Sequence, residues 1–130
     1  MNLADLADAA VELTDLQLVV LFGSAARGGV RATSDVDVAV MCDGAADLER
    51  LFLRLAPVFR TPRLDLVDLR RAGPLLAFEV ARSGVVLFER SPGVFRQFQS
   101  LASRRYADTK GLRDAQERSI RVFLGSERSA

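Results

Sequence analysis

The first third of the chain switches between the apolar spacing of helices and that of strands. An amphipathic helix is predicted at the start, because apolar residues recur at three- and four-residue steps: Leu3, Leu6, Ala10 and Leu13. The run LQLVVLF at 16–22 is apolar throughout, which is typical of a buried strand. The stretch SDVDVAVMC at 34–42 alternates strictly and predicts a second strand, with Asp35, Asp37 and Ala39 on one face.

The rest of the chain continues to alternate between helices and strands. A helix is expected over 45–59, a third strand in LDLVDL, a helix in PLLAFEVARSG closed by Gly84, and a fourth strand in VVLFE. Ser91 and Pro92 have the residue types of an N-cap and a first helical position, and they would open the last helical segment. The order of elements predicts a single α/β (α+β) domain over residues 1–130, in which helices pack on a sheet.

The last segment is longer than the predicted sheet needs. Its apolar stripe runs over 95–123, which as one helix would span roughly 40 Å. We therefore expect the part beyond Gly111 to remain uncovered and to offer Ile120 and Phe123, among several arginines, to another protein. The alternative is that Gly111 breaks the segment and the last helix folds back onto the core.

Composition limits the possible chemistry. The chain has one cysteine, Cys42, and no histidine, which excludes disulfide scaffolds, zinc clusters and a histidine base within this chain and leaves carboxylates for catalysis. The acidic start has no signal-peptide pattern and no apolar run reaches membrane-spanning length, so we expect a cytoplasmic protein without membrane contact. Basic residues outnumber acidic ones eight to four over 96–128; this fits a nucleic acid, an acidic protein or a solvated helix face equally well.

Two aspartates in an apolar strand require an explanation, because neighbouring carboxylates repel each other and are costly to desolvate. Asp35 and Asp37 would stand about 7 Å apart along the strand, and their side chains could converge on one Mg²⁺ ion. The alternative is a half-exposed strand with solvated aspartates. The preceding FGSAARGG favours the metal, since Gly23 lets the backbone approach a ligand and Ser24 offers its hydroxyl and N–H to a phosphate. Arg27 would assist there or form a structural ion pair.

A catalytic site of this kind also needs a group to take the proton of the attacking hydroxyl. LDLVDL offers Asp65 and Asp68, which project to opposite faces of their strand. Both have apolar neighbours, so the alternation alone does not choose between them.

The combination GSAARGGVRATSDVDVAV followed by LDLVDL resembles the signature of the DNA polymerase beta-like nucleotidyltransferase superfamily. The resemblance implies the nucleotidyltransferase fold, with a small mixed sheet flanked by helices. It also implies two Mg²⁺ ions held by Asp35, Asp37 and Asp65, which are the catalytic residues, and ATP phosphates bound at Gly23, Ser24 and Arg27. Asp68 lies outside the motif.

The chain length, FEVARSGVVLFER and RRYADTKGLRDAQ are similar to the minimal nucleotidyltransferases that serve as antitoxins to HEPN-domain ribonucleases. Such a protein transfers AMP from ATP to a tyrosine of its toxin. The resemblance thus implies a HEPN-domain toxin as partner, a hetero-oligomer with it, and no nucleic acid as direct substrate. Two alternatives stay open: transfer to a small molecule such as an aminoglycoside, and a non-catalytic antitoxin that neutralises its partner by binding.

Overall fold

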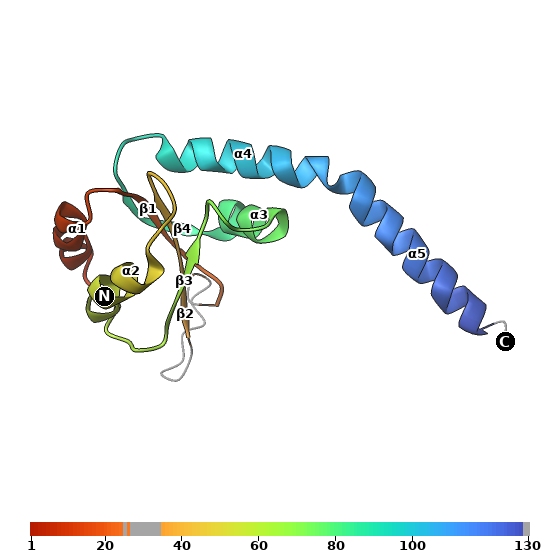
Figure 1. Cartoon of the computed structure of the whole chain (residues 1–130), viewed down its shortest axis with the longest axis horizontal. Helices are drawn as coiled ribbons and strands as arrows, with labels where there is room; N and C mark the ends of the chain where they lie inside the picture. Colours follow the sequence, from red (N-terminus) through yellow and green to blue (C-terminus); the bar gives the residue numbers. More distant parts are fainter. Residues whose placement is uncertain (25, 27–34, 129–130) are drawn as a thin grey trace.

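The computed structural model of this protein describes residues 1–24, 26 and 35–128 (Figure 1). Its elements are α1 (Leu3–Glu12), β1 (Leu16–Phe22), β2 (Val36–Cys42), α2 (Leu48–Phe59), β3 (Leu64–Asp68), α3 (Pro74–Ser83), β4 (Val85–Glu89), α4 (Val94–Asp108) and α5 (Lys110–Arg128). The predicted order of helices and strands is confirmed.

The four strands form one mixed sheet in the order β3-β2-β1-β4. Strand β1 runs antiparallel to both β2 and β4, whereas β2 and β3 are parallel and α2 connects them. In the parallel pair Asp37 lies opposite Asp65. Because side chains of paired residues in neighbouring strands project to the same face, both carboxylates face the same side of the sheet.

Each face of the sheet is covered by a separate apolar cluster. Helices α1 and α2 cover one face, where Leu6 and Leu55 pack with Val19 and Val38. Helices α3 and α4 cover the other face, where Val80 and Phe98 pack with Val20 and Ala39. Burying each of the leucine, valine and phenylalanine side chains stabilises the fold by about 2 kcal/mol relative to exposing it. Asp37 is two residues from Ala39, so it belongs to the face under α3 and α4.

Helices α2 and α4 both begin later in the chain than the sequence predicts. Helix α2 begins at Leu48 rather than at 45, because the Asp47 carboxylate accepts from the Arg50 N–H at 3.2 Å and caps the helix there.

The prediction that Ser91 and Pro92 open the last segment is wrong. Helix α4 begins at Val94 after Gly93, whose φ of 97° is left-handed. The carboxylate of Glu89 accepts from the Phe95 N–H at 2.9 Å and so supplies the cap from outside the helix.

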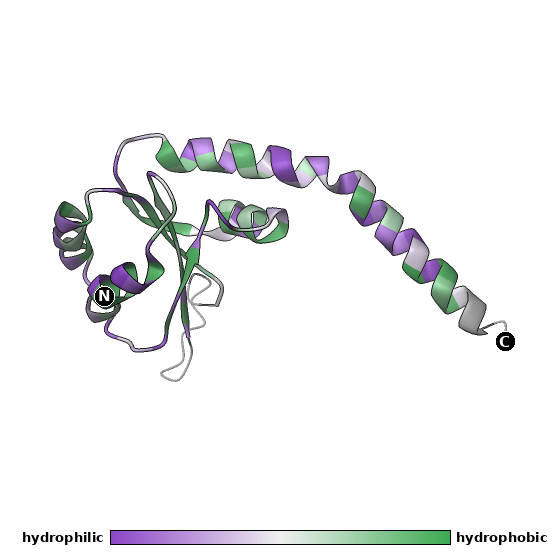
Figure 2. Cartoon of the chain, in the orientation of Figure 1, coloured by the Kyte–Doolittle hydropathy of each residue, from purple (hydrophilic) through white to green (hydrophobic). Residues whose placement is uncertain are grey.

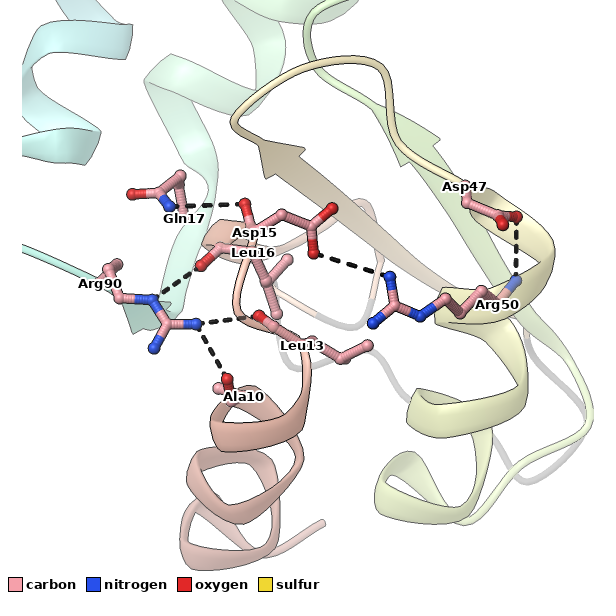
Figure 3. A network of polar contacts seen from close by, with 8 residues as sticks. All are labelled: Ala10, Leu13, Asp15, Leu16, Gln17, Asp47, Arg50 and Arg90. Carbon is pink, nitrogen blue, oxygen red and sulfur yellow. Dashed lines mark hydrogen bonds and ion pairs between the residues drawn. The ribbon is translucent and has the colours of Figure 1, made fainter.

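Arg90 connects the end of β4 to the end of α1 (Figure 3). Its guanidinium donates to the carbonyl oxygens of Leu16, Ala10 and Leu13 at 3.0, 2.9 and 3.0 Å. The last carbonyls of a helix have no partner within the helix, so Arg90 satisfies groups that would otherwise require water. Arg90 thus joins the end of α1 to β1 and β4, in addition to the apolar packing of α1 on the sheet.

Replacing Arg90 with alanine is expected to lower the free energy of unfolding by about 2 kcal/mol, because three backbone acceptors lose a charged donor. Urea unfolding followed by circular dichroism would measure the change. The matched control is Arg54→Ala, which removes an exposed ion pair with Glu12 and is expected to cost about 0.5 kcal/mol. Equal losses in the two variants would contradict the role given to Arg90.

The C-terminal segment consists of two helices that bend at Thr109 (Figure 1). Helix α4 packs on the sheet through Phe98 and Ala102, whereas α5 extends away from the body. The alternative that the last helix folds back onto the core is wrong, and the break lies two residues before Gly111. Within the described part of the chain, no helix is long and apolar enough to cross a membrane.

Candidate active site

A tight turn at Gly23 brings the end of β1 against Asp37 of β2. Phe22 is paired with Asp37, and Gly23 has a φ of 73°. A Cβ atom added to Gly23 would lie 2.6 Å from the Asp37 Oδ2 atom, which is closer than real Cβ atoms approach. Glycine is therefore required here both for its backbone conformation and for the space that the carboxylate occupies. Ser24 follows at an exposed position, and Arg27 lies outside the described residues.

Replacing Gly23 with alanine is expected to reduce activity and to cost about 1–3 kcal/mol of stability, because the left-handed backbone is strained for alanine and the new methyl group displaces the Asp37 carboxylate. Gly44→Ala is the matched control, since nothing lies within 4 Å of its added Cβ. Melting temperature and turnover should fall for the first variant only. Equal changes of melting temperature and turnover in the two variants would show that the Gly23 turn does not determine the position of the Asp37 carboxylate.

Asp37 and Asp65 form a carboxyl pair across β2 and β3. The two residues lie opposite each other in the parallel register, and both side chains project from the same face of the sheet. Burial raises the pKa of Asp37 above its ordinary value of 3.8, and the charges of Asp65 and then Asp35 raise this pKa further. A cation placed at this pair would relieve the same repulsion. The two carboxyls thus have the oxygen donors and the unbalanced charge that Mg²⁺ prefers.

Asp35 lies just before β2 and is exposed. Its charge reaches Asp37, because it contributes to the raised pKa of that group. Among the described residues, no three acidic or cysteine side chains already enclose a position for a metal ion. The arrangement consists of Asp37 and Asp65 facing each other across β2 and β3, with Asp35 two residues before Asp37 on the same chain.

Glu79 adds a further negative charge from α3. Its charge also raises the pKa of Asp37, although less than the other causes do. No motif of the sequence marks Glu79 as part of the site. The helix over 74–84 was predicted, but the rotation of a helix about its own axis depends on packing, so nothing in the sequence told which side chain would face the aspartates.

Asp68 points away from this site, and its carboxylate is buried and hydrogen-bonded to backbone N–H groups. It is 5% exposed and lies opposite Val40, on the face under α1 and α2. Its two oxygens accept from the Ala46 N–H at 3.1 Å and the Arg70 N–H at 3.0 Å. The expectation that Asp65 rather than Asp68 shares the face of Asp37 agrees with the observed register. The functional role of Asp65 remains a prediction.

Residues 5–93 match the family described as "Polymerase beta, Nucleotidyltransferase". This chain belongs to that nucleotidyltransferase family. The match begins in α1, includes all four strands and ends at Gly93, one residue before α4. It therefore contains the Gly23 turn and all three aspartates, while α4 and α5 lie outside it.

Proteins similar to this nucleotidyltransferase include a protein adenylyltransferase and a chain of a toxin–antitoxin complex. The chain is 30% identical over 123 residues to the protein adenylyltransferase MntA of Aphanizomenon flos-aquae (strain 2012/KM1/D3), covering 84% of this chain and 81% of MntA. It resembles a chain of a toxin–antitoxin complex crystallised with AMP-PNP, at 26% identity, a TM-score of 0.78, and coverage of 92% and 98% of the two chains. The resemblance to minimal nucleotidyltransferases and the predicted fold are confirmed.

A third comparison supports the fold. A complex of tri-AMPylated HEPN toxin with MNT antitoxin from Shewanella oneidensis contains a chain with a TM-score of 0.64 and 23% identity. That match covers 89% of the present chain and 98% of the other.

Proposed function

We propose that this nucleotidyltransferase is an antitoxin that transfers AMP from ATP to a tyrosine hydroxyl of a HEPN-domain toxin. The observation that carries the proposal is the carboxyl pair of Asp37 and Asp65 beside the Gly23 turn, in a chain 30% identical to a protein adenylyltransferase. The solved complexes support the same partner, because one relative was crystallised with AMP-PNP and another accompanies an AMPylated HEPN toxin.

In the proposed reaction the acceptor oxygen attacks the α-phosphorus of ATP, the bond to the bridging oxygen breaks, and pyrophosphate leaves. Asp65 takes the proton of the attacking hydroxyl. The turn at Gly23 and Ser24 holds the departing phosphates through its backbone N–H groups and hydroxyl, with Arg27 adding positive charge. Asp35, Asp37 and Asp65 would hold two Mg²⁺ ions, which when bound neutralise developing charge on the phosphates. Because the reaction consumes ATP, we place the protein in the cytoplasm.

The test is incubation with ATP labelled at the α-phosphate, Mg²⁺ and a purified HEPN-domain toxin. Label on the toxin that disappears with EDTA and returns with added Mg²⁺ would support the proposal. Label on an added aminoglycoside instead would favour a small-molecule acceptor. A chain that binds the toxin and transfers no label to it would be a non-catalytic antitoxin, and the proposed function would be wrong.

A further inference from the structure

We propose that one face of α5 docks an amphipathic helix of the acceptor protein that carries an acidic side chain opposite Arg118. This inference rests on the proposed function, since it names the surface that holds the acceptor. We call the surface the α5 apolar face. It is formed by Leu112, Ala115, Ser119, Ile120, Val122 and Phe123.

The α5 apolar face is exposed along its length. Leu112, Ile120 and Phe123 are 64%, 59% and 62% exposed, and Figure 2 shows apolar residues recurring along a helix that stands clear of the sheet. Monomeric proteins seldom expose a contiguous patch of large apolar side chains without a binding role. Other large apolar side chains of the described residues are exposed too, such as Val11 and Leu53, but α5 contributes no residue to either cluster on the sheet.

The shape of this face fits another helix. Two adjoining hollows lie along it, and the small residues Ala115 and Ser119 line both. Larger side chains border the hollows, with Leu112 and Ile120 at one and Val122 and Phe123 at the other. Alternation of large and small residues along a helix allows side chains of a facing helix to insert as knobs into holes.

The charges of α5 favour an acidic residue on the docked helix. Lys110 pairs with Asp114 at 3.0 Å, and Arg121 pairs with Glu117 at 2.6 Å, so these charges are balanced within α5. Arg118 borders the hollow formed with Val122 and Phe123, and it has no ion pair or hydrogen bond with any residue that the structure describes. A carboxylate of the partner protein could form an ion pair with Arg118 at this edge of the α5 apolar face.

The direction of α5 is fixed by a clamp at the bend, formed by Phe78, Tyr106, Thr109 and Arg113. The Arg113 guanidinium lies 3.9 Å from the centre of the Tyr106 ring and donates to its hydroxyl at 3.0 Å and to Thr109 Oγ1 at 2.9 Å. The Tyr106 ring stacks on Phe78 of α3 with centroids 3.9 Å apart. Docking on a helix that is already positioned avoids part of the entropic cost of ordering it.

The clamp also places α5 on the side of the sheet that carries the aspartate site. Helix α3 carries Phe78 and Glu79 and covers the face of the sheet to which Asp37 and Asp65 belong. Helix α5 leaves the body from α4, on that same side (Figure 1). A protein held on α5 is therefore on the side of the sheet where the acceptor hydroxyl must arrive.

The match to the complex crystallised with AMP-PNP extends into α5. It covers 92% of 130 residues, which leaves about ten unmatched, fewer than the 19 residues of α5. At least about nine residues of α5 therefore belong to the structure shared with a chain that was crystallised in a toxin–antitoxin complex. This continuity favours a toxin helix over a second copy of the chain as the occupant.

The test measures the affinity of the full chain for a purified HEPN-domain toxin by calorimetry. The double variant Ile120→Asp with Phe123→Asp is expected to bind at least about tenfold more weakly, and to raise the KM for toxin while the KM for ATP stays unchanged. Leu53→Asp is the matched control, because Leu53 is 68% exposed on α2 at the opposite face of the sheet. Arg118→Glu should also weaken binding, whereas Arg121→Glu should have little effect.

Unchanged affinity in the double variant and in Arg118→Glu would overturn the proposal. So would loss of folding in the double variant, seen by circular dichroism, together with full toxin affinity in the folded Arg118→Glu protein. A dimer in sedimentation that the double variant dissociates, with toxin affinity unchanged, would assign the α5 apolar face to a second copy. If the unaltered chain binds toxin through α5 but transfers no AMP, the docking surface stands and the proposed function fails.

Discussion

Asp37→Asn is expected to lower AMP transfer by at least about a hundredfold while the chain remains folded. The substitution keeps the volume of the side chain and removes the charge that a bound cation requires. Asp35→Asn is expected to cause a loss of the same order, because Asp35 supplies the other carboxylate of the motif. Single-turnover transfer at saturating Mg²⁺ would measure both, and near-normal rates in either variant would contradict the assignment of that residue to the metal.

The same substitution should leave the metal-free protein equally stable or more stable. The pKa of Asp37 is raised by folding, so its ionised form costs folding free energy once the pH exceeds the ordinary value of 3.8. At neutral pH asparagine removes that cost, and below this pH the difference between variant and parent should disappear. Thermal melts in EDTA at neutral and acidic pH would show the effect. A destabilised Asp37→Asn protein would mean that the carboxyl pair is a structural contact.

Asp65→Asn and Asp68→Asn are expected to have opposite consequences. Asp65→Asn should abolish transfer with little change in melting temperature, because Asp65 is exposed and faces Asp37 across the parallel strands. Asp68→Asn should preserve the rate and cost about 1–2 kcal/mol of stability, since an amide has one acceptor oxygen and leaves the N–H of Ala46 or Arg70 unpaired.

Rates and melting temperatures measured in parallel on the two variants test the assignment. The opposite pattern, an inactive but stable Asp68→Asn and an active but unstable Asp65→Asn, would show that β3 pairs with β2 in a different register.

The sequence predicts the strands and the shared face of the aspartates well, because period-two alternation determines which side chains lie together within one strand. It does not predict how β3 is placed beside β2. Both Asp65 and Asp68 keep the apolar alternation of LDLVDL, and only the pairing of Asp37 with Asp65 separates them. The register describes how two strands pair, so it cannot be predicted from the sequence of one strand alone.

The errors at the two ends of α4 have a similar origin. Ser91 and Pro92 have the residue types of a helix start, but Glu89 caps the Phe95 N–H from the preceding strand and the helix begins at Val94. At the other end Gly111 is the weaker helix former, yet the break falls at Thr109, whose hydroxyl donates to the Tyr106 carbonyl at 2.7 Å. A contact from another element decides the first boundary and a side-chain hydrogen bond at the end of α4 marks the second, so helix propensity decides neither.

The bend at Thr109 separates two kinds of evolutionary constraint. Every residue of the sheet and of the aspartate site precedes Gly93, while the exposed side chains of α5 are remote from both cores. Surface substitutions of this type usually change stability by no more than about 0.5 kcal/mol. Duplicated genes encoding such chains can accumulate changes in α5 one at a time without losing the fold or the aspartate site. Two toxin–antitoxin pairs in which each antitoxin binds only its own toxin can thus arise within one genome, while the chemistry of AMP transfer stays the same.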